Sequence, residues 1–142
     1  QAKNNLASLS NFYKKPKKKK SNQASLPHLH KVMNGNKNAM VEMIDIFLKQ
    51  LPESLEKMKS SLQNKDWKKT HFEAHKLKST IGIIGLEKLH QLILTINEYT
   101  RESKKLHLVP KLFNDFENQI KIDLEIVQKE RKRLTRGRRK IN

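Results

Sequence analysis

Apolar residues in this 142-residue chain recur every three or four positions over four long stretches, a spacing that places them along one face of an α-helix. No stretch alternates apolar and polar residues with a period of two over a useful length. The pattern therefore predicts an all-α fold, an antiparallel four-helix bundle with short connections. The expected inward positions are Met40, Met43, Ile44, Phe47, Leu48, Leu51, Leu55, Met58 and Leu62, then Trp67, Ala74, Leu77, Ile81 and Ile84, then Leu86, Leu89, Leu92, Ile93 and Ile96, and finally Leu112, Phe116, Ile120, Leu124 and Val127.

Local signals indicate where the first helices begin and end. An extra short helix is expected after Pro27, ending at Asn34 and Gly35. The first long helix ends near Asn64, and Pro52 within it either kinks that helix or opens a new first turn.

The later boundaries follow from similar signals. Asp66 is a suitable N-cap for the next helix and Gly85 a suitable end for it. Pro110 marks the start of the last helix, because proline fits the first helical turn.

The net charge of +17 is concentrated at the two ends of the chain. Gln1–Lys20 holds seven Lys and no acid, and Lys129–Asn142 holds eight basic residues against one Glu. The 108 residues between carry only +3. The basic character therefore belongs to two tails rather than to the bundle.

This charge distribution suggests three segments. Residues 1–24 are expected to be a basic flexible linker, residues 25–128 the helical bundle domain, and residues 129–142 a basic extension of the last helix. The chain has no Cys, which excludes disulfides and Cys-ligated zinc, and no apolar run long enough to span a bilayer. It begins at Gln1 without an initiator Met or signal-like segment, so we expect a cytoplasmic fragment of a longer protein.

The most informative stretch surrounds His75. On a helix, His75, Lys78, Ser79 and Gly82 lie at positions i, i+3, i+4 and i+7, on a mostly exposed strip beside the apolar face. Small residues leave room for another molecule to approach, and the cation favours an anionic group on the ring. A neutral imidazole is a good nucleophile near neutral pH.

This stretch resembles the His-containing phosphotransfer (HPt) domains of multistep phosphorelays. Their signature is an exposed His followed by Lys three residues later, small residues four and seven later, and Gly ten later. The resemblance covers about residues 25 to 130. The matching positions are His75, Lys78, Ser79, Gly82 and Gly85, with flanks that include Phe47, Leu48, Leu51, Pro52, Leu55, Asn64, Asp66, Trp67 and Leu86–Leu89.

The resemblance implies a phosphocarrier rather than an enzyme. A receiver domain of a response regulator, carrying phosphoaspartate, would dock on the helix, and His75 would attack the phosphorus through Nε2 and later pass the group to another receiver. Lys78 would stabilise the phosphorylated state. The chain itself needs no cofactor or metal, because the receiver brings Mg²⁺. We expect the parent protein to be a hybrid sensor histidine kinase, of a kind that can be anchored in the inner membrane, with this domain at its C-terminal end. The domain itself is expected to be monomeric.

The sequence departs from the family at one position and suggests supporting residues at two others. Ser79 stands where the family most often has Gly, which keeps access open but changes the docking surface. The positions that match a supporting Gln and Arg in some family members are Asn97 and Arg101. Asn97 is expected to hydrogen-bond a ring nitrogen of His75, and Arg101 to add positive potential.

Three other interpretations remain open. One alternative is a helical module that binds nucleic acid through the basic tails, Lys14–Lys20 and Arg131–Lys140, although we do not expect nucleic acid to be the primary partner. Ser79 suggests another, a pseudo-HPt scaffold that binds receivers without accepting phosphate. His71 and His75 are spaced to chelate a metal, although no third ligand is evident. No role is assigned to His28, His30, His90 and His107. The aromatic residues expected in the core or at helix contacts are Phe47, Trp67, Phe72, Phe113 and Phe116.

Overall fold

The computed structural model describes residues 26–141, with side chains described up to Arg136. The expected linker at residues 1–24 lies outside the described residues. Within residues 26–141 there is no strand, and no helix is long and apolar enough to cross a membrane. The elements are α2 (Pro27–Val32), α3 (Lys37–Gln63), α4 (Trp67–Ile84), α5 (Glu87–Glu102), the 3-10 turn η2 (Leu106–Leu108) and α6 (Val109–Ile141).

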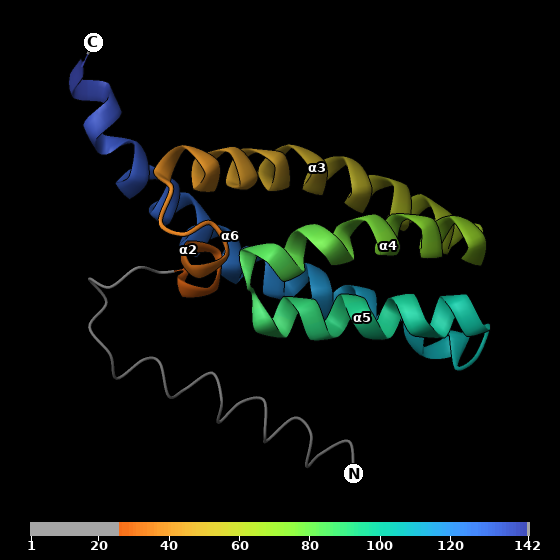
Figure 1. Ribbon diagram of the computed structural model, residues 1–142. Coiled ribbons are helices and arrows are strands. Elements are labelled where there is room, and N and C mark those ends of the chain that lie inside the picture. The colour runs from red at the N-terminus through yellow and green to blue at the C-terminus, as the bar shows by residue number, and fades with distance from the viewer. Residues whose placement is uncertain (1–25, 142) are drawn as a thin grey trace.

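The four long helices form the predicted bundle, and α2 is the predicted short helix before it (Figure 1). α4 packs between α3 and α5, α6 packs against α5 and α3, and α2 packs against α4. Two ion pairs show that α3 and α6 run in opposite directions. Lys59 pairs with Glu117 at 3.9 Å, whereas Asp45, earlier on α3, pairs with Arg131, later on α6.

Helix ends occur where the sequence predicts them. The Asp66 carboxylate accepts a hydrogen bond from the Lys69 backbone N–H at 3.2 Å, which satisfies one free donor of the first turn of α4. Gly85 ends α4 in the left-handed conformation, with φ of 87°. Pro52 lies on the exposed side of one continuous α3, so it does not start a separate helix.

The core contains the residues that the periodicity predicts. Every expected inward position is either buried or partly buried against the core cluster. The fully buried side chains at its centre include Phe47, Met58, Ile81, Ile84, Ile93, Ile96 and Phe116. The expected positions that are only partly buried are Met43, Leu48, Leu55, Leu62, Trp67, Leu92, Leu112 and Leu124. This core fixes which faces of α4 and α5 remain in solvent.

The packed part of α6 extends beyond the expected boundary at residue 128. Glu130 is 1% exposed and Leu134 is 3% exposed, so both lie against the bundle. The Arg133 guanidinium donates two hydrogen bonds to the Glu130 carboxylate, at 2.9 and 2.7 Å. The first residues of the segment expected to be a basic tail therefore belong to the bundle, and the charge of Arg133 is paired with that of Glu130.

Candidate functional site

His75 lies in the middle of α4 with its side chain exposed, one residue away from buried Ala74 and two from buried Leu77. Ser79, one turn later, is also exposed, and Lys78 is partly exposed. The structure therefore places these three side chains on the solvent side of the helix. No ion pair to Lys78 is found among the described side chains, so its charge is available to a bound anion.

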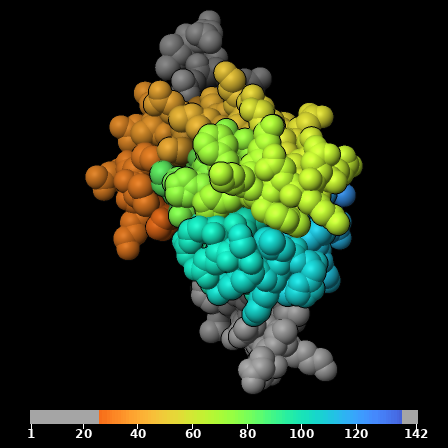
Figure 2. All heavy atoms as spheres, turned by 90° about the vertical axis from the view of Figure 1, so that its right-hand side faces the viewer, coloured from red at the N-terminus to blue at the C-terminus, as the bar shows by residue number. Residues whose placement is uncertain are grey.

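The face around His75 is formed by two helices. Figure 2 looks along the bundle from the end where α3 leads into α4, and the green atoms of α4 lie directly beside the teal atoms of α5. A surface pocket at this end is lined by Asp66, Lys68, Lys69, His71, Phe72 and His75. The candidate nucleophile therefore borders a shallow, open depression of the surface.

Gly82 is the point at which α5 comes closest to the strip. A Cβ atom on Gly82 would lie 3.0 Å from Nε2 of His90, closer than such atoms normally approach. A side chain at Gly82 would therefore require the His90 ring to shift by a few tenths of an ångström. The sequence alone does not reveal this contact, because it depends on which turn of α5 faces α4.

His90 is a functional candidate that the sequence analysis missed. Partial burial lowers the pKa of His90 from its usual 6.5, and the nearby charge of Lys78 and His28 lowers it further, while Glu87 opposes both. Lys78 therefore acts electrostatically on a second imidazole, two turns from His75 along the same face.

The structure does not bring Asn97 and Arg101 into hydrogen bonding with His75. Asn97 is 4% exposed, and its side-chain oxygen has no hydrogen-bond partner in the described part of the chain. Arg101 donates to its neighbour Glu102 at 2.8 Å instead. Direct support of His75 by these two residues stays a prediction.

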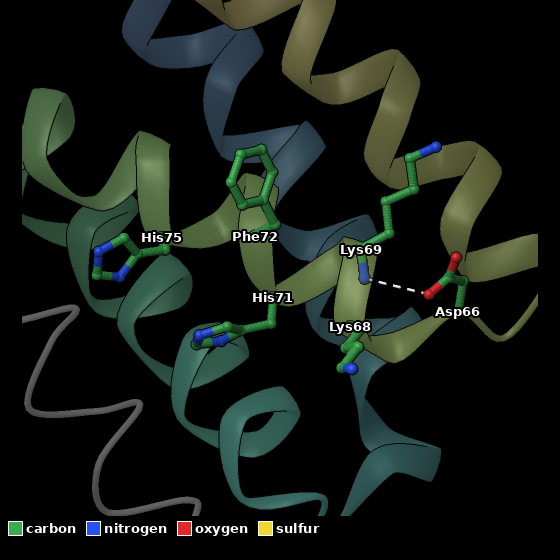
Figure 3. Close-up of a pocket in the computed structure, with 6 residues that line it drawn as sticks. All are labelled: Asp66, Lys68, Lys69, His71, Phe72 and His75. Atoms are coloured by element: carbon green, nitrogen blue, oxygen red, sulfur yellow. Dashed lines mark hydrogen bonds between the residues drawn. The ribbon is translucent and has the colours of Figure 1, made fainter.

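Asn97 instead contacts another histidine, His71. Nδ1 of His71 lies 3.2 Å from the backbone carbonyl oxygen of Asn97 and 3.4 Å from the hydroxyl of Thr100. The rings of His71 and His75 lie 6.0 Å apart, centroid to centroid, with planes inclined by 37°. Figure 3 shows both rings extending from the same side of α4. The sequence analysis considered His71 only as a metal ligand.

The expectation that Phe72 lies in the core or at a helix contact is wrong. Phe72 is 59% exposed and lines the same pocket as His75. The Lys76 ammonium lies 5.2 Å from the centre of its ring, within cation–π range, and 3.4 Å from the Glu73 carboxylate. An apolar side chain thus stands in solvent one turn before the candidate nucleophile.

The site offers little to a metal ion. Within the described residues, no group of three or more His, Asp or Glu side chains is arranged to hold one. His71 and His75 alone supply at most two ligands, and His71 already uses Nδ1 to bond α5.

Comparison with known proteins shows the family of the chain. A family model described as Hpt domain matches residues 42–130, more than half of the chain. The match covers all of α4, with His75, and all of α5, together with most of α3 and the first part of α6. Neither the search of curated proteins nor the search of solved structures gave a match. The chain folds into a helical bundle with an exposed histidine on α4, and it belongs to the Hpt domain family.

Proposed function

We propose that His75 is the phosphoacceptor of a phosphorelay and that the chain carries phosphoryl groups between response-regulator receiver domains. The observation that supports this most directly is the exposed His75 on α4, with small Ser79 and cationic Lys78 beside it, in a chain of the Hpt family. As a member of that family the domain is a phosphocarrier rather than a catalyst.

The transfer step is an in-line displacement at phosphorus. The lone pair of one ring nitrogen of His75, Nε2, forms the N–P bond while the bond from phosphorus to the receiver aspartate breaks. The aspartate leaves as a carboxylate with the bonding electrons. The ring then loses its Nδ1 proton to solvent, and the reverse sequence returns the group to a receiver. Mg²⁺ belongs to the receiver in this scheme, and the carrier supplies alignment and positive potential.

The exposed face of α4 is the surface that a receiver would cover. Phe72 supplies apolar contact area on one side of His75, and the small side chain of Ser79 leaves space for a partner on the other side. Lys78, which has no ion pair to another described side chain, supplies positive charge opposite the acidic pocket of a receiver. We infer a cytoplasmic setting and a hybrid sensor kinase as the parent protein from the family resemblance.

Phosphotransfer from a panel of phosphorylated receivers tests this proposal. The wild-type chain is expected to take up acid-labile, alkali-stable label, and His75→Gln is expected to lose it. His107→Gln, an exposed histidine in η2, is the matched control and should retain label. Label that persists in His75→Gln contradicts the assignment, and receiver binding without label in the wild type identifies a scaffold instead.

A further inference from the structure

A second imidazole borders the space that a phosphoryl group on His75 would occupy. His71 precedes His75 by one helical turn, and both line one surface pocket. The ring separation of 6.0 Å is within the range at which aromatic side chains contact one another. In Figure 3 the Lys69 side chain points away from the two rings. His71 is therefore a candidate to interact with a group attached to His75.

The hydrogen bonds of His71 determine which ring nitrogen faces α5. A carbonyl oxygen only accepts, so the 3.2 Å contact with Asn97 requires that Nδ1 carry the proton. The Thr100 hydroxyl donates to the Ile96 carbonyl at 2.8 Å, which leaves its oxygen able to accept from the same Nδ1–H. Nδ1 is thus committed to α5, and Nε2, one ring carbon away, has no hydrogen-bond partner among the described residues.

Phosphorylation of His75 adds negative charge next to this second ring. Anionic phosphoryl oxygens favour the protonated form of a neighbouring imidazole, because opposite charges attract at short range. A protonated His71 keeps its Nδ1–H bond to Asn97 and gains an Nε2–H that is free to donate. The other charged residues that line this pocket are Asp66, Lys68 and Lys69.

We propose that His71 is a second phosphoryl-binding residue, which donates a hydrogen bond from Nε2 to the phosphoryl group on His75 while Asn97 and Thr100 hold its ring in place. This inference rests on the proposed function of His75. It gives Asn97 a role that differs from the one predicted from the sequence, because Asn97 then acts on the site through its backbone carbonyl and through His71.

Two substitutions at His71 separate donation from packing. His71→Phe keeps a planar ring and removes both nitrogens, whereas His71→Gln loses the ring and keeps an N–H donor of similar reach. The phosphodonor is phosphoramidate: its P–N bond breaks, its nitrogen leaves as ammonia with the bonding electrons, and the N–P bond to His75 forms. The readout is the initial rate at which label appears on His75.

Donation by His71 predicts opposite results for the two variants. His71→Phe should be phosphorylated about tenfold more slowly, the loss expected for one charge-assisted hydrogen bond to the reacting group. His71→Gln should stay within about threefold of the wild type, as should the control His107→Phe. A packing role would reverse the order of the two His71 variants, and that result would overturn the proposal.

Nitrogen-15 spectra of the wild-type chain provide a measurement that needs no variant. Before phosphorylation, the bond to the Asn97 carbonyl oxygen predicts a proton on Nδ1 of His71. After phosphoramidate treatment, Nε2 should change to the shift of a protonated nitrogen. Label on His75 with an unchanged His71 overturns this inference alone, whereas absence of label on His75 overturns the proposed function as well.

Discussion

Arg131 of α6 and Asp45 of α3 form a two-point ion pair between residues 86 positions apart in the sequence. Nε lies 2.6 Å from one carboxylate oxygen, and a terminal guanidinium nitrogen lies 3.2 Å from the other. Arginine and carboxylate match in this geometry, so the pair defines the position of α6 along α3. It lies beyond the boundary at which the sequence suggested that the bundle ends.

This pair should contribute modestly to stability and in a salt-dependent way. Both side chains are 40% or more exposed, so solvent screens their attraction. A double-mutant cycle of Asp45→Asn and Arg131→Gln, followed by urea unfolding, should give a coupling energy of about 0.3–1 kcal/mol at low salt. The coupling should shrink in about 1 M NaCl. A coupling of zero at low salt would show that the contact does not hold α6 in place.

Gly85 should be much less tolerant of alanine than Gly35. Both have positive φ, 87° and 71°, which disfavours any side chain. A Cβ on Gly85 would also lie 2.5 Å from Cβ of His28 in α2, whereas on Gly35 it meets only the end of the His30 ring at 3.3 Å. Gly35→Ala should lose about 1 kcal/mol and Gly85→Ala about 2–4 kcal/mol of unfolding free energy. Equal losses in thermal or urea unfolding would argue against the α2 contact.

The buried carboxyl group of Asp123 should make the free energy of unfolding decrease as the pH rises. Burial raises the pKa of Asp123 from 3.8 to about 6, against the opposing effects of its hydrogen bond from Gln119 and the charge of Lys88. The folded state therefore binds more protons than the unfolded state between these two values, so the free energy of unfolding decreases over that interval.

Asp123→Asn removes this ionisation and measures its effect. Relative to wild type, the variant should gain up to about 3 kcal/mol between about pH 4 and about pH 7.5, because each pKa unit corresponds to about 1.4 kcal/mol. Urea unfolding at both pH values measures the gain, and Glu125→Gln, an exposed acid on α6, is the control. A difference between Asp123→Asn and wild type that does not change with pH would contradict the assignment.

The titration of His90 should report the charge of Lys78. Burial is the largest cause of its lowered pKa, and Lys78 and Glu87 act in opposite directions. Lys78→Met should therefore raise the pKa of His90, and Glu87→Gln should lower it. Proton NMR of the His90 ring across the titration measures both shifts. A fall in the pKa with Lys78→Met would mean that the Lys78 ammonium does not point toward His90.

Ser79 should control access by a large donor more than by a small one. Ser79→Leu keeps a helix-compatible residue but fills the space beside His75, so transfer from a receiver should fall by about tenfold or more through steric conflict. Phosphorylation by phosphoramidate should change by less than about threefold. Asn118→Leu, on the exposed side of α6, should affect neither rate. Equal losses with both donors would place Ser79 in the chemistry rather than in docking.

Much of the fold follows from local chemistry, which is why the sequence predicts it. The cap at Asp66 and the left-handed end at Gly85 each depend on residues within one helical turn. The inward positions follow from a single period, so Phe47 and Ile81 could be placed without knowing their neighbours. The sequence left open whether the helix continues through Pro52. The packing of α3 on the rest of the bundle decides this, and the local pattern contains no information about that packing.

The parts of the site that the sequence did not predict depend on contacts between helices. The bond from His71 to Asn97 requires that particular turns of α4 and α5 lie opposite each other. Phe72 has the large apolar side chain of a typical core residue, yet its position on α4 is next to the inward face rather than on it. Leu134 was missed because it lies among charged residues that hide the spacing of its apolar face.

The uninterrupted course of α6 has a mechanical consequence. Its 33 residues form one helix from Val109 to Ile141, a rod about 50 Å long at 1.5 Å per residue. This rod packs on α3 and α5 and is still buried against the bundle at Leu134, and Figure 1 shows its far end projecting past the other helices. A stiff rod transmits torque, so a twist applied at the basic end turns the whole bundle and the face with His75 along with it.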